Sequence, residues 1–379
     1  MMLALLPAMM TAQEARIALG PWLQAVGPDS FTVVWTTTQD AVAWVEVAPT
    51  DDTHFYAEQR PQYYESRFGR RPVGRLHRIT VTGLEPGTAY RYRIMMQTAS
   101  WKDGRLVMGE CCGSGVYRQR PYSVTTLNST SERVKFAVGN DFHEGDEKFR
   151  NLFSKIANGG YDFVCLNGDM TSAIDWAGAI EDNYLRSAVQ MFASRIPMYM
   201  VRGNHENRGC SPELFMDYFP TSTGQPYYTF RQGPAFFIVL DCGEDKPDND
   251  IENRSLALFD DHRLRELDWL RSVVNSEEFR SAPFRIVFCH MPPEDRGWHG
   301  NRQIEQLFMP VLDSAGVDLM ISAHIHQYRF EKSGTRGHSF PVLCNPNRQR
   351  MDVEIHDGQI DIEIFDNSVT QTKKLTIKK

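Results

Sequence analysis

Short strand-like segments dominate the first third of the chain. Residues 31–35, 77–81 and 90–94 are rich in β-branched and aromatic side chains, and segments containing Pro or Gly separate them. Many short strands punctuated by such turns are typical of antiparallel sheets that pack face to face. The pattern therefore predicts an all-β sandwich over residues 17–127.

The turn between two of these segments has a distinctive sequence. Residues 84–90 read LEPGTAY, and this turn resembles the tyrosine corner of fibronectin type III domains. The insertions at 51–75 and 100–120 are longer than the compact version of that fold carries. The resemblance implies that residues 17–127 form a fibronectin type III-like sandwich.

The hydrophobic pattern changes after a polar linker at residues 128–133. Apolar runs then recur at 134–138, 163–166, 198–201, 236–240, 284–289, 317–321 and 341–344. Helical spacing appears between several of these runs, and it predicts that Leu264, Leu267 and Leu270 share the apolar face of one helix. Strands that alternate with helices indicate βαβ units, so residues 134–379 are predicted to form a layered α/β domain.

Polar motifs follow several of the apolar runs directly. They are Gly139-Asn140-Asp141-Phe142-His143, Asn167-Gly168-Asp169, Gly203-Asn204-His205-Glu206, Cys289-His290 and Ala323-His324-Ile325-His326. Each motif is weak by itself, but ligands of α/β sheets gather beyond the carboxyl ends of the strands, where these motifs lie. Nitrogen and oxygen donors without thiolate suit Zn, Mn or Fe. The donors outnumber the ligands of one tetrahedral metal, and Asp169 is suitably placed to bridge two metals.

The ordered set of Asp-x-His, Gly-Asp, Gly-Asn-His-Glu, His and His-x-His resembles that of the calcineurin-like metallophosphoesterases. The resemblance covers roughly residues 134–365. Together with the predicted sandwich before it, the whole chain resembles the purple acid phosphatase branch of that superfamily. This implies a catalytic domain with αββα layers and a hydrolase of phosphate esters that uses two metal ions, drawn from Fe, Zn and Mn.

The resemblance also implies a role for each motif. The implied ligands are Asp141, His143, Asp169 and His326 for one metal, and Asp169, Asn204, His290 and His324 for the other. His205 would act as a catalytic residue beside the substrate, where it stabilises the transition state or protonates the leaving oxygen. Two cations neutralise the charge of a phosphate ester and lower the pKa of bound water, so we expect attack by a metal-bound hydroxide.

The chain departs from the purple acid phosphatases in three places. Their first motif is Asp-x-Gly, whereas this chain has His143, which is expected to fill a ligand position. Ser172 stands where they have the tyrosine that binds ferric iron, and Ala323 replaces a glycine. An obligatory Fe(III) site is therefore not implied.

The loop after His290 is predicted to contact the substrate. It reads MPPEDRGWHG, and it offers Arg296, Trp298 and His299 as candidate contacts. A phosphomonoesterase is favoured by the spacing of His299 and by the two-domain resemblance. A phosphodiesterase remains the alternative, because His143 is shared with many diesterases. A surface-adhesion or glycan-binding protein with a relic catalytic domain is the alternative from another class.

The composition limits the classes of partner. Hydrophobic residues make up 41% and charged residues 23% of the 379 residues, which is typical of a globular protein. The net charge of −7 disfavours a general polyanion binder, because such proteins carry a cationic excess. We expect a small phosphorylated substrate and no nucleic-acid partner. No apolar run reaches the roughly 20 residues that span a bilayer, and the oligomeric state is left open.

The first residues resemble a secretory signal. Residues 1–10 are almost wholly apolar, and Thr11-Ala12-Gln13 follows. These features match the hydrophobic region and the cleavage zone of a signal peptide, although no basic residue precedes Arg16. They predict a signal peptide at residues 1–13 and a secreted, periplasmic or cell-surface location. The seven cysteines leave the redox compartment undecided.

Overall fold

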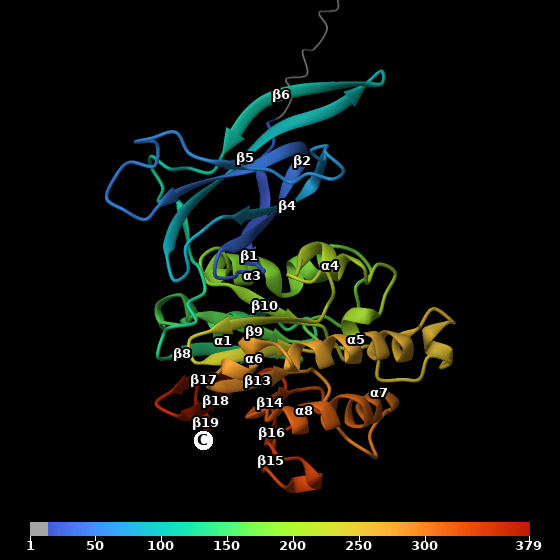
Figure 1. The fold of residues 1–379 in the computed structure, drawn as a ribbon. Helices are drawn as coiled ribbons and strands as arrows, with labels where there is room; N and C mark the ends of the chain where they lie inside the picture. Colours follow the sequence, from blue (N-terminus) through green and yellow to red (C-terminus); the bar gives the residue numbers. More distant parts are fainter. Residues whose placement is uncertain (1–13) are drawn as a thin grey trace, which may run out of the picture.

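The computed structural model describes residues 14–379, and the predicted signal peptide lies outside them. Residues 17–125 form an antiparallel β domain, drawn in blue and cyan in Figure 1. Its strands are β1 (Ile17–Gln24), β2 (Ser30–Pro49), β3 (Gln62–Tyr63), β4 (Gly74–Thr82), β5 (Ala89–Lys102), β6 (Arg105–Gly113) and β7 (Tyr122–Thr125). The strand-like segments of the sequence thus lie on strands, as predicted.

The long strand β2 holds this domain together. Its first half pairs with β1 and β4, and its second half pairs with β5 and β3. The register with β4 shifts between Thr36 and Ala41, so the two halves of β2 pair with different strands. Alternate residues of β2, including Phe31, Val33 and Trp35, are fully buried and form the core between the layers.

The predicted tyrosine corner is present at the turn before β5. The hydroxyl of Tyr90 accepts a hydrogen bond of 2.9 Å from the backbone N–H of Glu85. This bond satisfies a donor in the turn that no strand partner reaches. The local geometry therefore agrees with the fibronectin type III-like resemblance.

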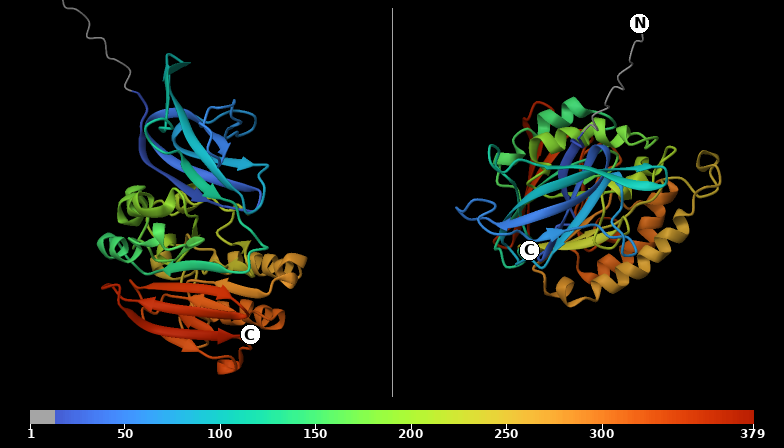
Figure 2. Two further views of the ribbon diagram at one scale, coloured as in Figure 1. Left: turned by 90° about the vertical axis from the view of Figure 1, so that its left-hand side faces the viewer. Right: turned by 90° about the horizontal axis from the view of Figure 1, so that it is seen from above.

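Two mixed six-stranded sheets form the second domain (Figures 1 and 2). The first has the order β10-β9-β8-β17-β18-β19, and the second has the order β11-β12-β13-β14-β16-β15. The strands of the first sheet are β8 (Val134–Gly139), β9 (Phe163–Asn167), β10 (Met198–Val201), β17 (Arg350–His356), β18 (Gln359–Phe365) and β19 (Gln371–Lys378). Those of the second are β11 (Tyr228–Gln232), β12 (Ala235–Val239), β13 (Phe284–Phe288), β14 (Leu319–Ser322), β15 (Arg329–Glu331) and β16 (Val342–Cys344).

The two sheets pack face to face through aromatic side chains. Phe136 stacks on Phe163 with ring centroids 4.7 Å apart, and its ring edge meets Phe237 at 5.4 Å. All three side chains are fully buried. The interface explains why these strands read as nearly continuous apolar runs, because both faces of each sheet are covered.

Helices cover the outer faces of the two sheets and complete the four layers. They are α1 (Asp146–Phe153), α2 (Gly178–Ile180), α3 (Arg186–Ala188), α4 (Leu214–Tyr218), α5 (Phe259–Val274), α6 (Glu277–Ser281), α7 (His299–Gln303) and α8 (Met309–Ala315). Helix α1 packs its buried phenylalanines on the first sheet, and α5, α6 and α8 pack on the second. None of the helices within residues 14–379 combines the length and apolar character needed to cross a membrane.

Strand β1 fixes the sandwich to the first sheet of the second domain. The indole N–H of Trp22 donates to the carbonyl of Tyr218 at 2.9 Å, and the amide of Gln24 donates to the carbonyl of Met198 at 2.8 Å. The hydroxyl of Tyr199 donates in return to the carbonyl of Val26 at 2.9 Å. Because Trp22 is fully buried, this contact combines apolar burial with satisfied polar groups.

One prediction about helix α5 is wrong. Leu264 is 51% exposed, whereas Arg263 and Glu266 are buried on the face that also carries Leu267 and Leu270. The helix is rotated because Arg263 donates to the carbonyl of Cys242 and Glu266 accepts from a backbone N–H after β12. The buried backbone groups after β12 need hydrogen-bond partners, so the face of α5 that carries Arg263 and Glu266 packs inward.

This rotation predicts different costs for two leucine substitutions on one helix. Leu267→Ala should lower the free energy of unfolding by about 2–5 kcal/mol, since its side chain packs against the second sheet. Leu264→Ala should change the free energy of unfolding by about 0.5 kcal/mol or less. Urea denaturation of the two variants measures this, and equal losses would contradict the observed face.

Candidate metal centre

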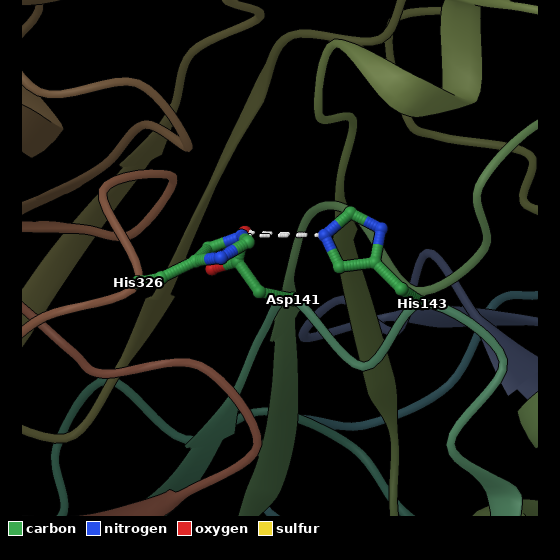
Figure 3. Close-up of side chains that lie close together, drawn as sticks. All are labelled: Asp141, His143 and His326. Carbon is green, nitrogen blue, oxygen red and sulfur yellow. Dashed lines mark hydrogen bonds and ion pairs between the residues drawn. The ribbon is translucent and has the colours of Figure 1, made fainter.

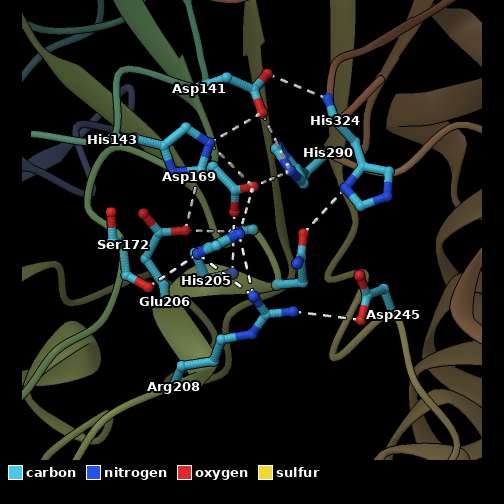
Figure 4. A network of polar contacts seen from close by, with 12 residues as sticks. Asp141, His143, Asp169, Ser172, His205, Glu206, Arg208, Asp245, His290 and His324 are labelled. Atoms are coloured by element: carbon cyan, nitrogen blue, oxygen red, sulfur yellow. Dashed lines mark hydrogen bonds and ion pairs between the residues drawn. The ribbon is translucent and has the colours of Figure 1, made fainter. Parts of the chain in front are cut away.

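The predicted ligands meet at one edge of the two sheets. Strands β8, β9 and β10 run parallel, as do β13 and β14, so their carboxyl ends lie at the same edge. Asp141 and His143 follow β8, Asp169 follows β9, Asn204 and His205 follow β10, His290 follows β13, and His324 and His326 follow β14. Figure 4 shows most of these side chains directed toward one another.

Asp141, His143 and His326 form the first group of donors (Figure 3). Nε2 of His326 lies 3.2 Å and Nε2 of His143 lies 3.9 Å from Oδ1 of Asp141. The two imidazole nitrogens are 3.3 Å apart. Oδ2 of Asp169 lies 4.0 Å from Nε2 of His143, so this carboxylate borders the first group.

Asp169 also belongs to the second group, with His290 and His324. Nε2 of His290 lies 3.0 Å from Oδ2 of Asp169. Nδ1 of His324 lies 3.1 Å from Oδ1 of Asn204, which brings the amide oxygen into the same group. One carboxylate thus stands between two sets of donors.

Two buried donor atoms have no hydrogen-bond partner. Oδ1 of Asp141 and Nε2 of His290 are both shielded from solvent, and neither makes a hydrogen bond. Nδ1 of His290 donates to the carbonyl of Asn167 at 2.7 Å, so Nε2 is the nitrogen left to bind a metal ion. Leaving such groups unpaired is costly, and a bound cation removes the cost. The donor set therefore fits metal ions.

The charges in the cluster influence one another strongly. Burial disfavours the charged form of His290, but the carboxylates of Asp169 and Asp141 raise its pKa to about 10. Burial and the neighbouring His290 lower the pKa of His324 to about 4. A metal ion must displace the proton of His290, so its affinity rises with pH below that value.

Most of the predicted ligands lie in strained backbone. The residues with positive φ include Asp141, His143, Asp169, His324 and His326. Non-glycine residues seldom adopt this conformation, and such strain gathers at functional sites. Two glycines of the motifs make room for it: a Cβ on Gly168 would collide with His290, and one on Gly203 would collide with the carboxylate of Asp169.

Asn140 and Asn345 hold the first carboxylate, and neither was assigned a role from the sequence. The amide of Asn140 donates to Oδ2 of Asp141 at 2.7 Å, and its carbonyl accepts from the amide of Asn345 at 2.6 Å. Neighbours along a strand face opposite ways, which would turn Asn140 away from Asp141. That rule ends where β8 ends, because Asp141 has φ of 51°. Asn345 directly follows β16, and a polar residue at a strand end was the signal in the sequence that could have identified it.

Glu206 organises the loops beneath the centre in the same way. Its carboxylate accepts from the backbone N–H groups of Asp169 and Gly203 at 2.9 Å and of Met170 at 2.8 Å. Burial and the charge of Asp169 raise the pKa of Glu206 to about 7. The glutamate of the Gly-Asn-His-Glu motif thus joins the loops after β9 and β10.

His205 lies beside the donors. Its Nδ1 donates to the carbonyl of Ser172 at 2.8 Å, and its backbone N–H donates to Oδ1 of Asp169 at 3.0 Å. Its Nε2 remains 3.9 Å from Oδ2 of Asp169. Ser172, at the position of the family's tyrosine, thus contributes through its backbone by orienting this ring.

Arg208 is a further polar group of the site that the sequence reasoning missed. Its Nη1 lies 3.1 Å from Nε2 of His205 (Figure 4). Its other nitrogens form a two-point contact with Glu244, at 3.0 Å from Nε and 2.8 Å from Nη2. The only signal in the sequence was a basic residue three positions after His205.

The three predicted residues of the substrate loop make their polar contacts away from the metal ligands. Trp298 is 60% exposed and stacks on the ammonium group of Lys246, while Arg296 is exposed. His299 begins α7 and pairs with Asp260 at 2.7 Å. In the described part of the chain, none of the three makes a hydrogen bond or an ion pair with a predicted metal ligand.

Comparison with protein-family models gives two matches. The calcineurin-like phosphoesterase model matches residues 134–328, which is more than half of the chain. The model of the purple acid phosphatase N-terminal domain matches residues 20–106. The two matched regions correspond to the two domains of the structure.

Individual relatives and a solved structure agree with these matches. Purple acid phosphatase 18 of Arabidopsis thaliana is 22% identical over 89% of this chain and 70% of its own length. Acid phosphatase type 7 of Mus musculus is 25% identical over 79% of this chain and 67% of its own. The structure of a purple acid phosphatase from yellow lupin seeds has a TM-score of 0.64 at 14% identity, and it covers 94% of this chain and 74% of its own.

These matches confirm both the resemblance inferred from the motifs and the predicted fold class. The structural likeness supports the fold, and the ordered motifs provide the candidate metal ligands. The chain belongs to the calcineurin-like phosphoesterases and carries the N-terminal domain of the purple acid phosphatases.

Proposed function

We propose that this protein hydrolyses phosphate monoesters at a centre of two metal ions. The observation that carries the proposal is the convergence of carboxylate, imidazole and amide donors around Asp169, with two buried donor atoms left without a hydrogen bond. A structural polar cluster would satisfy these atoms internally. Membership of the phosphoesterase family supports the same chemistry.

The two donor groups suggest how the metals are held. In this proposal Asp141, His143, Asp169 and His326 bind one ion, and Asp169, Asn204, His290 and His324 bind the other. Imidazole and oxygen ligands without thiolate suit Fe, Zn and Mn. When bound, the ions would offset the charge of the phosphoryl group and lower the pKa of the attacking water.

His205 is the proposed acid–base group. The carbonyl of Ser172 accepts a hydrogen bond from Nδ1, so Nε2 is the nitrogen left to face the reacting groups. Nε2 lies 3.9 Å from Oδ2 of Asp169 and 3.1 Å from Nη1 of Arg208, a position from which it could contact the leaving oxygen. Nε2 can donate a proton to that oxygen when the ring is charged.

The loop that carries Arg296, Trp298 and His299 is proposed to contact the organic part of the substrate. Trp298 supports this best, because its exposed indole lies near Lys246, beside the Asp245 that contacts Arg208. A diesterase is the second candidate function, since the same indole surface suits a second organic group. His299 would have to leave Asp260 before it could take part.

The remaining expectations stay predictions. A secreted or periplasmic location depends on the apolar residues 1–10. The adhesion alternative requires a relic catalytic domain, and the complete donor set argues against it. Activity toward p-nitrophenyl phosphate and its bis ester, with and without Mn, Zn or Fe, separates the three functions.

Metal removal is the first test of this proposal. Chelation should abolish hydrolysis, and added metal should restore it. Asp169→Asn should lower both metal content and kcat by orders of magnitude, because the proposed bridge loses its charge. Elemental analysis and p-nitrophenyl phosphate assays measure the two quantities. A metal-free Asp169→Asn protein with full activity would overturn the two-metal centre.

A second prediction concerns the residue behind the first carboxylate. Asn140→Ala should weaken metal binding about 10–100-fold, because it frees Asp141 from the bond that orients it. The exposed Asn275, which donates only to the carbonyl of Arg271, provides the control variant Asn275→Ala. Titration of apo protein with Zn or Mn measures both. Equal affinities would show that Asn140 does not support the centre.

His205 provides a third prediction. His205→Ala should keep both metals and lower kcat about 10²–10⁴-fold. The loss should be larger for an alkyl phosphate than for p-nitrophenyl phosphate, whose leaving group needs little protonation. His356→Ala is the control, since that ring pairs with Asp357 and Asp361 at a strand end. Losses of one size for both esters would mean that His205 only binds phosphate.

A further inference from the structure

One edge of the guanidinium of Arg208 is held by Glu244, and the other edge faces His205 beside the metal centre. Nε and Nη2 contact the two oxygens of Glu244, whose side chain is 4% exposed, and Nη2 also lies 3.3 Å from Asp245. A two-point contact of this kind fixes the plane of the guanidinium. Nη1 is therefore aimed in one direction, with little freedom to turn away.

That direction is the face of the centre beside His205. In the part of the chain that the structure describes, Nη1 makes its polar contacts with the ring of His205 alone, through a hydrogen bond of 3.1 Å to Nε2, and it lies 3.5 Å from Nδ1. Nδ1 donates to Ser172, so Nε2 of the neutral ring can accept from Arg208. Nη1 carries two hydrogens, and one of them remains for another acceptor.

The same arginine is open to solvent-borne ligands. Its side chain is 28% exposed, and together with Glu244 it lines a cavity of about 740 Å³. The cavity also includes Met216, Leu256 and Phe259, which gives it an apolar part. None of the predicted metal ligands lines this cavity, so Arg208 borders the cavity and, through its contact with His205, the donors.

We propose that Arg208 binds a terminal oxygen of the substrate phosphoryl group and makes the site selective for monoester dianions. The proposal rests on the proposed function of the same centre. A monoester has three terminal oxygens and a diester has two, so the monoester leaves one more oxygen to be neutralised after the metals are engaged. A fixed guanidinium supplies charge and directed donors for that oxygen.

Three variants test this role in metal-loaded protein. Arg208→Gln should lower kcat/KM for p-nitrophenyl phosphate about 10–100-fold, which is the cost of one charge-assisted hydrogen bond. It should leave kcat/KM for the bis ester nearly unchanged. Arg208→Lys should recover part of the lost kcat/KM, because lysine keeps the positive charge but lacks the two-point donor geometry of a guanidinium. Arg271→Gln, at an exposed arginine that pairs with Asp268, is the control and should change neither value.

Binding gives a readout that does not depend on turnover. Calorimetry should show that Arg208→Gln weakens the binding of inorganic phosphate by about the same factor as it lowers kcat/KM. Binding of dimethyl phosphate should be largely unaffected. Metal content and circular dichroism spectra should match those of the unaltered protein.

A double-mutant cycle separates direct contact from an effect through His205. If Arg208 contacts the phosphoryl group, the loss caused by Arg208→Gln persists in the His205→Ala background. A loss that disappears in that background, equal losses for both esters, or unchanged phosphate binding would each overturn the proposal. Failure of the unaltered protein to hydrolyse either ester would instead overturn the proposed function.

Discussion

The structure around the metal centre depends on burying carboxylates and imidazoles together with incomplete hydrogen bonding among them. Oδ1 of Asp141 and Nε2 of His290 have no hydrogen bond, and Asp169 lies within 4.0 Å of three imidazole nitrogens. In a low-dielectric interior such a cluster is costly unless cations occupy it. Stability of the centre and metal binding are therefore two aspects of one interaction.

The surrounding polypeptide holds this unfavourable arrangement in place. Glu206 accepts three backbone N–H groups and so joins the loops after β9 and β10. Asn140 joins the loop after β8 to Asn345, which directly follows β16 in the other sheet. Both connections lie directly behind the ligands, where they can oppose the strain recorded in the positive φ angles. Residues that follow strands of both sheets thus hold the same site.

His205 lies beside Asp169, and Arg208 contacts His205. Each is oriented by a separate partner, Ser172 for the imidazole and Glu244 for the guanidinium. Orientation by these partners leaves Nε2 of His205 and Nη1 of Arg208 facing each other at 3.1 Å beside the donors. In the proposed function, the site would therefore combine a cation-binding part with a part that offers proton and hydrogen-bond donors.

The sequence by itself determined the order of strands and the motifs at their ends, because apolar runs and the residues that stop them are local features. The position of Asp169 between two donor groups followed from the same motifs. Only the tertiary structure decided which face of α5 packs, where Leu264 is exposed and Glu266 is buried. It also decided the roles of Asn140, Asn345 and Arg208. Asn140 contacts Asn345, 205 residues away, and Arg208 contacts Glu244, 36 residues away. Such contacts depend on the tertiary fold rather than on any local pattern.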